Sequence, residues 1–246
     1  TMRLKPSYRE FNIMNSQDQM GVYQELQQKG YLNYAELATS ASSGIYGKMY
    51  QLLSQYDPAT GQFALANTDE AIGNYLRAAE YRNTNWFGDL FSNAVMHNHS
   101  VSISGGTDKA QFYSSLSAMF DPGWTKQSRV QRFTGNLNTS YRLSSKVNVN
   151  LISNASYRKQ RAPGTLSSET DAVTGEVKRD FDINPYSYAL NTSRALDPNA
   201  YYTRNYAPFN IYNELNNNYM DLNVNDIRVQ GRLNYHPISK VELSLL

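Results

Sequence analysis

Apolar and polar residues alternate along much of the second half of the chain. In residues 132–143 the odd positions are mostly apolar and the even positions are polar: Phe133, Gly135, Leu137, Thr139, Tyr141 and Leu143 against Arg132, Thr134, Asn136, Asn138, Ser140 and Arg142. Successive side chains of a strand point to opposite faces, so this period of two predicts a strand with one apolar and one polar face. Its length suits the about 9–11 residues with which a tilted strand crosses an outer membrane.

The same alternation predicts further strands at 98–104, 110–120, 146–158, 227–235 and from 241 onward, with Ile152 and Ser153 as exceptions. Short connections at 105–109, 144–145 and 236–240 are rich in Gly, Ser, Asp and Pro, as hairpin turns are. Longer connections occupy 121–130 and the stretch from 159 to about 221. Short turns at one rim and long loops at the other are typical of a transmembrane β-barrel with periplasmic turns and extracellular loops.

The region before residue 98 follows a different pattern. We expect residues 1–11 to be the first barrel strand, with the strand itself at 3–11, and helix signals follow. One helix is predicted after a cap at Asn15 or Ser16 and ends at Gly30, and another at 69–81 is capped by Thr68. A weaker helix is predicted between 34 and 56. We therefore expect 12–97 to be a long, partly helical extracellular loop, and 98–246 to be barrel strands with their turns and loops.

Composition agrees with this class. The mean hydropathy is −0.61, and the chain has no run of about 18 apolar residues that would make a membrane helix. A barrel hides its apolar residues in alternation, and 20 Tyr with 9 Phe suit aromatic belts at both membrane interfaces. The net charge of +2 comes without a basic run, which argues against nucleic acid as a partner. Residues 1–10 contain no signal peptide, so an exported protein would start upstream.

Several motifs in order carry a family resemblance. Residues 83–123 read NTNWFGDLFSNAVMHNHSVSISGGTDKAQFYSSLSAMFDPG, and they combine N-T-x-W, S-x-S-G-G-T-x-K, Y-x-S-L and a D/E-G turn. This stretch resembles the SusC/RagA family of TonB-dependent outer-membrane transporters. Residues 132–141, 184–197 and 210–219 resemble the following family strand and loop. The resemblance covers most of the chain from about residue 83 onward.

The resemblance implies an all-β fold in which this chain is part of an antiparallel barrel of about 22 strands, located in the cell outer membrane and in contact with its lipid. It implies active import of an oligosaccharide or peptide, a SusD-like surface lipoprotein as lid, and TonB with ExbB and ExbD as energy source. The about seven predicted strands cannot close such a barrel, so the chain reads as its early strands without the plug or the TonB box. The resemblance implies no cofactor and no enzymatic activity.

Two groups of residues are candidates for the transport path. The first group contains polar residues on the predicted lumen-facing side, which either pack against the plug or line the substrate path: Arg132, Asn136, Asn138, Arg142, Asn148, Asn150, Asn154, Arg228, Gln230 and Arg232. The second group is Tyr201, Tyr202 and Tyr206, whose rings could stack on sugar or peptide side chains. Loop packing, or docking of the lid lipoprotein, is the alternative role of these tyrosines.

Other classes of protein remain as alternatives. A soluble all-β glycan-binding module also shows alternating strands and exposed tyrosines, and a passive porin shares the same strands. His97 and His99 have the spacing of two metal ligands on one strand face, but no Cys or pair of carboxylates completes a metal site, so we expect no metal there. The sequence contains no G-x-S-x-G, Walker or H-E-x-x-H motif, which argues against an enzyme.

Overall fold

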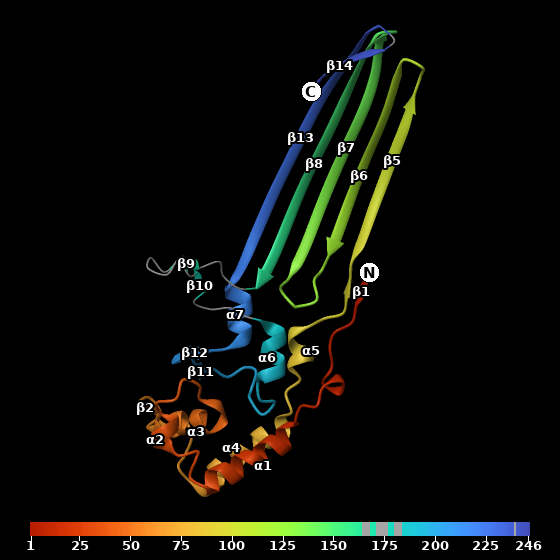
Figure 1. Ribbon diagram of the computed structural model, residues 1–246. Helices are drawn as coiled ribbons and strands as arrows, with labels where there is room; N and C mark the ends of the chain where they lie inside the picture. Colours follow the sequence, from red (N-terminus) through yellow and green to blue (C-terminus); the bar gives the residue numbers. More distant parts are fainter. Residues whose placement is uncertain (164–167, 171–176, 180–183, 239) are drawn as a thin grey trace. The chain divides into compact units, whose positions relative to one another are not determined.

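The structure is a computed structural model that describes residues 1–163, 168–170, 177–179, 184–238 and 240–246 (Figure 1). The chain forms two compact units. The sheet unit contains Thr1–Leu4, Asn93–Ala162 and Met220–Leu246, and the helical unit contains Lys5–Ser92 and Pro163–Tyr219. The helical unit is thus built from two long segments of the chain, and the chain returns to the sheet unit after each of them.

Six strands form one antiparallel sheet in the sheet unit. They are β5 (His97–Gly106), β6 (Ala110–Asp121), β7 (Arg129–Ser144), β8 (Val147–Pro163), β13 (Tyr219–Ile238) and β14 (Val241–Leu245). The spatial order β14-β13-β8-β7-β6-β5 follows the order along the chain, as Figure 1 shows. The sheet is therefore a meander, in which each long strand lies beside the next.

All six strands predicted from residue 98 onward are confirmed, and most of them are longer than the alternation indicates. The strand β7 begins at Arg129 instead of residue 132, and β13 begins at Tyr219 instead of residue 227. Backbone hydrogen bonds between strands do not require alternating side chains. The alternation therefore marks only the part of each strand that has one apolar face.

Short turns and longer connections lie at opposite ends of this sheet (Figure 1). At one end, β5 and β6 are joined by three residues, and the amide of Thr107 donates to the carbonyl of Ala110 at 2.6 Å. At the other end, residues 122–128 join β6 to β7. In that loop Gly123 has φ +78° and donates its N–H to Asp121 Oδ1 at 3.0 Å, a turn that favours glycine.

The prediction of an opening strand within residues 1–11 is wrong for most of that segment. Only β1 (Met2–Arg3) is extended and paired, and its partner is β4 (Ala94–Val95). The 3₁₀ helix η1 (Tyr8–Glu10) follows, since Pro6 has no amide hydrogen to donate to a ladder and the Ser7 hydroxyl caps the turn. The aromatic ring of Tyr8 then packs 4.8 Å from that of Phe87 instead of lying in a sheet.

The helical unit contains seven α-helices in its described residues. They are α1 (Ser16–Gln28), α2 (Tyr34–Leu37), α3 (Gly44–Ser54), α4 (Asp69–Arg82), α5 (Trp86–Leu90), α6 (Pro185–Asn191) and α7 (Ile211–Asn217). Three two-stranded hairpins accompany them: β2 (Tyr56–Asp57) with β3 (Gln62–Phe63), β9 (Ser168–Thr170) with β10 (Val177–Arg179), and β11 (Tyr202–Arg204) with β12 (Ala207–Phe209). None of the described helices is long and apolar enough to cross a membrane.

The predicted caps set the bounds of the two longest helices. The Asn15 side chain accepts from the amide of Asp18 at the start of α1, and the Thr68 hydroxyl accepts from the amide of Ala71 at the start of α4. The weaker helix predicted between 34 and 56 is divided into α2 and α3. The apolar stripes of these helices meet in one core: Met20, Ile45, Tyr46, Met49, Ala79 and Ala195 are buried together.

The N-T-x-W motif fastens this core to residues 193–196. Asn83 ends α4 with φ 47°, and the Thr84 hydroxyl donates to the carbonyl of Leu196 at 2.7 Å. The buried Trp86 ring donates its Nε1–H to the carbonyl of Ser193 at 3.1 Å. Buried backbone carbonyls need such partners, so the motif acts as a clamp between two distant parts of the sequence.

Replacing Trp86 with Phe should loosen this clamp. Phe preserves most of the ring packing but cannot donate, so the carbonyl of Ser193 loses its bond, which costs about 1–3 kcal/mol. In the purified full-length protein, we expect amide hydrogen exchange at residues 193–196 to accelerate about tenfold or more.

The matched control is Trp124→Phe, because Trp124 donates to the carbonyl of Leu4 at 2.8 Å within the sheet unit. This variant should leave exchange at 193–196 unchanged. Unchanged exchange in Trp86→Phe would show that the indole hydrogen bond does not hold this segment.

Candidate functional site

The register of the sheet gathers the apolar side chains on one face. Val101 lies opposite Leu116, Leu116 opposite Gly135, and Gly135 opposite Ala155, and residues directly opposite each other share a face. Large apolar side chains on this face are widely exposed, for example Val101 at 67% and Ile227 at 78%. A contiguous apolar surface of this kind is uncommon on a monomeric soluble protein and marks an interaction surface.

The opposite face is polar. Register pairs Arg132 with Arg158, Asn136 with Asn154, and Arg142 with Asn148. The other members of the predicted polar group lie at even-numbered positions of β7, β8 and β13, on this same face: Asn138, Asn150, Arg228, Gln230 and Arg232. Asn136 donates to the Ser115 hydroxyl at 3.0 Å. The structure therefore brings all ten residues to one face, while their role in transport stays a prediction.

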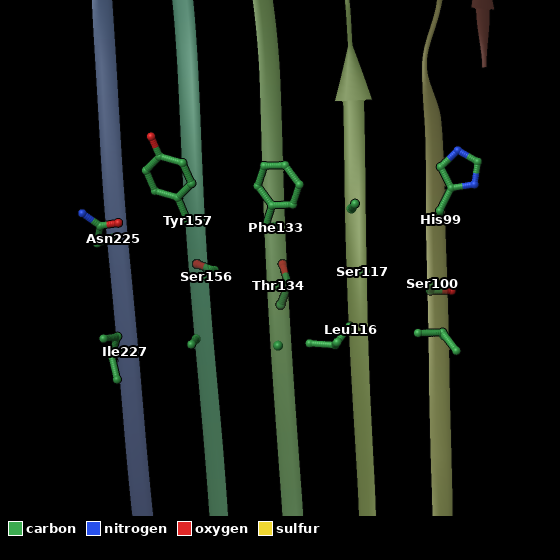
Figure 2. Close-up of a pocket in the computed structure, with 14 residues that line it drawn as sticks. His99, Ser100, Leu116, Ser117, Phe133, Thr134, Ser156, Tyr157, Asn225 and Ile227 are labelled. Carbon is green, nitrogen blue, oxygen red and sulfur yellow. The ribbon is translucent and has the colours of Figure 1, made fainter.

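The apolar face ends at a row of rings near the long-loop end. Figure 2 shows His99, Phe133 and Tyr157 at one level of the sheet, with Leu116 and Ile227 in the next row; Ala118 of β6 lies between His99 and Phe133. Beyond the rings the same face becomes polar, with Gln131 and Lys159 opposite each other. In β13 the side chains on this face also change, from polar up to Asn225 to apolar from Ile227 onward. This change explains why the alternation of apolar and polar residues begins only at residue 227. The residues on this face are polar on one side of the change and apolar on the other: Asp221, Asn223 and Asn225 against Ile227, Val229 and Leu233.

His97 and His99 lie together at this boundary. His97 Nδ1 is 3.0 Å from His99 Nε2, and the His97 ring packs 5.2 Å from that of Phe120. Within the described part of the chain, no cluster of three or more His, Cys, Asp or Glu could hold a metal ion. The two imidazoles therefore form a hydrogen-bonded pair.

A cavity of about 460 Å³ lies within the helical unit. Its walls come from the start of α3, from α6, from residues 192–198 and from β11. Trp86 and Tyr188 form an aromatic wall with ring centroids 5.2 Å apart, and Arg204 adds a positive charge 4.9 Å from the Phe209 ring. The cavity has the size and mixed lining of small-ligand sites, with aromatic surfaces and a few polar groups.

Burial controls the electrostatics of this cavity. Desolvation raises the pKa of Tyr188 to about 12, and a hydrogen bond with Thr192 and the charge of Arg204 offset this only in part. Burial also raises the pKa of Tyr202. Both hydroxyls are neutral at physiological pH, so the cavity offers neutral hydrogen-bonding groups beside one cation.

The three predicted tyrosines have different surroundings. Tyr202 lines the cavity, and its hydroxyl accepts from the amide of Asp197 at 2.8 Å. Tyr201 and Tyr206 are exposed, at 46% and 77%. Tyr206 has φ 62° in the turn between β11 and β12. Contact of these residues with a substrate stays a prediction.

The sequence reading missed the residues that position the cavity. Asn184 caps α6 with Pro185 at its first turn, and Asn210 caps α7 through the amides of Tyr212 and Asn213. An Asn followed by Pro is a recognisable helix start, so α6 could have been found from sequence. The approach of Arg204 to Tyr188 could not, because it depends on the β11–β12 hairpin.

Comparisons with known proteins agree with this fold. No family model matches the chain. The TonB-dependent receptor P26 of Formosa agariphila is 32% identical over 81 residues, which are 33% of this chain and 8% of that receptor. Among solved structures, the RagAB peptide importer in the closed-closed state and the RagAB peptide transporter each contain a chain that this fold resembles. Each match has a TM-score of 0.60 at 15% identity and covers 99% of this chain.

The chain thus shares its fold with one segment of the matched RagAB chains. It spans 26% of the matched RagAB chains, about a quarter of their length. Together with the motifs in residues 83–123, these matches confirm the resemblance to the SusC/RagA family of TonB-dependent outer-membrane transporters.

Replacing Tyr188 with Phe should make the fold more resistant to alkali. A pKa raised from 10 to about 12 in the folded state contributes stability that is intact below pH 10 and lost as pH rises toward 12. Phe cannot ionise, so we expect the midpoint of alkaline unfolding to move to higher pH, as measured by circular dichroism of the full-length protein. Equal alkaline midpoints would contradict the burial argument.

At neutral pH the two proteins should differ only by the lost hydroxyl hydrogen bond, about 0.5–1.5 kcal/mol. The neutral measurement therefore separates the ionisation effect from a general effect of the substitution.

Proposed function

We propose that this chain forms early strands and extracellular loops of a TonB-dependent transporter of about 22 strands, which imports an oligomeric nutrient across the outer membrane. The observation that carries the proposal is the continuous apolar face of the sheet. Phe133 near one end of that face and Tyr141 near the other are eight residues apart on β7. That spacing suits the about 9–11 residues of a membrane-crossing strand, with aromatic girdles at both interfaces.

The polar face then lines the barrel interior. Its Arg, Asn and Gln side chains offer many hydrogen bonds of moderate strength, either to a plug that occludes so wide a barrel or to the passing substrate. Residues 98–246 provide the barrel strands and their connections, and 12–97 form a long extracellular loop, which contains most of the helical unit. In this proposal η1, which precedes residue 12 and belongs to the helical unit, lies on the extracellular side together with that loop.

Import would involve no covalent chemistry in this chain. The helical unit presents the cavity and the exposed tyrosines Tyr201 and Tyr206 to a glycan or peptide, and a SusD-like lipoprotein covers this side. The similarity to a peptide importer in the fold comparison favours a peptide. TonB with ExbB and ExbD supplies the energy through other parts of the transporter. A soluble glycan-binding module and a passive porin are the alternatives that the experiments must separate.

Purification of the full-length protein from outer membranes tests the class. We expect it to require detergent and to bring down a surface lipoprotein in a one-to-one ratio. Uptake of its nutrient should stop when TonB is removed. Recovery in the soluble fraction would favour the binding module, and uptake that persists without TonB would favour a porin.

Substituting both Tyr201 and Tyr206 with Ala tests the substrate contact. Stacked aromatic contacts contribute about 0.5–1.5 kcal/mol each, so two lost rings should weaken binding about fivefold to a hundredfold. Binding is measured by calorimetry with the purified transporter, using peptide and oligosaccharide mixtures. The control is Tyr81→Ala, because Tyr81 is also exposed, at 71%, but lies on α4 outside the cavity lining, and this variant should change affinity little. Unchanged affinity in the double variant would remove these tyrosines from the site.

A further inference from the structure

Two recesses follow each other on the apolar face of the sheet. The first, of about 700 Å³, has small residues on its floor in three neighbouring strands, Ala118, Gly135 and Ala155. Larger side chains such as Leu116 and Ile227 border it, as Figure 2 shows. The small floor residues create a hollow in a surface that otherwise presents large apolar side chains.

The second recess, of about 410 Å³, begins one row closer to the long loops. His97, Phe120 and Gln131 line it, and they lie opposite one another across three strands. The row of His99, Ala118 and Phe133, which belongs to the first recess, lies directly next to this row on the same face of the sheet. The apolar hollow therefore continues into a polar one on the same side of the sheet.

The second recess has a basic rim. Arg129 and Arg161 line it, and Lys159 lies opposite Gln131. Asp221 accepts two hydrogen bonds from Arg161, including one of 2.7 Å at Nε, which satisfies that guanidinium. Arg129 and Lys159 are exposed and interact with Asp221 only over a longer range. Asp121 also lines this recess and is paired with Arg3. Four cations, Arg3 included, and two carboxylates leave a net positive charge beside the apolar hollow.

We propose that these recesses bind one phosphorylated, acylated lipid of the outer leaflet. The acyl chains lie over Ala118, Gly135 and Ala155, and the phosphate lies between Arg129 and Lys159. This lipid site rests on the proposed function, because it requires this face to lie in the membrane with its long-loop end outward. Guanidinium and ammonium groups placed beyond an aromatic row are the groups that bind lipid phosphates at a membrane surface.

The imidazole pair has a place in this arrangement. His99 lines the first recess and His97 the second, so the pair lies where the acyl chains would join the headgroup. Imidazole nitrogens can donate to phosphate or ester oxygens there. The site thus combines an apolar hollow, polar donors at its edge and cations outside it, in the order in which a phospholipid presents its parts.

The test measures lipid retained by the full-length protein purified from outer membranes in mild detergent. Phosphorylated lipid is quantified per protein by mass spectrometry and phosphate analysis. Replacing both Arg129 and Lys159 with Gln should lower retained phosphorylated lipid about tenfold or more. Ala155→Leu, which fills the hollow without changing charge, should also lower it.

The control is Arg158→Gln, because Arg158 lies next to Lys159 in β8 but on the opposite face. This variant should retain as much lipid as the unchanged protein. If the double variant does not reach the membrane, Lys159→Gln alone replaces it.

The outcomes separate this inference from the proposed function. A protein that stays in the outer membrane but retains equal lipid in the charge variants and in Ala155→Leu overturns the lipid site and leaves the transporter proposal standing. Recovery of the unchanged protein without detergent overturns both.

Discussion

Strand register is the constraint on which the sheet depends. A slip of one residue between neighbouring strands would move every side chain to the other face. The observed register places Leu116 opposite Gly135 and Asn136 opposite Asn154, so apolar and polar residues stay separate across the strands. Each large apolar side chain left in water forgoes about 1.5–3 kcal/mol. A few of these would equal the whole net stability of a typical domain, so the apolar face needs an apolar environment.

The helical unit depends on a different kind of interaction, which is hydrogen bonding between distant segments. Ser16 and Asn83 bond to each other in both directions, with the Asn83 amide 3.0 Å from the Ser16 hydroxyl. Thr84 and Trp86 then hold residues 193–196. Buried polar groups are costly unless paired, so these contacts specify one arrangement of segments that lie 67 to 112 residues apart in sequence. Such an arrangement can hold a cavity in a fixed shape without a sheet beneath it.

Local signals predicted much of this fold. The period of two located the six strands, and side-chain caps at Asn15 and Thr68 located the two longest helices, because both patterns depend on residues close in sequence. The prediction of an opening strand is wrong because Pro6 has no amide hydrogen to donate to a ladder and the ring of Tyr8 packs against Phe87. The cavity near Tyr188 could not be predicted, since its walls come from segments that only tertiary hydrogen bonds bring together.

The position in each strand at which the apolar face becomes polar gives information about the surroundings of the sheet. On β13 the polarity of the faces changes between Asn225 and Ile227, although the strand continues without a break from Tyr219. The change on β8 falls between Tyr157 and Lys159, next to the ring row in Figure 2. The two changes lie within about one row of each other. Backbone pairing alone gives no reason for neighbouring strands to change so close together, whereas a boundary between lipid and water does. The agreement between strands therefore supports the proposed membrane interface at this row, for which the basic residues would lie just outside the hydrocarbon.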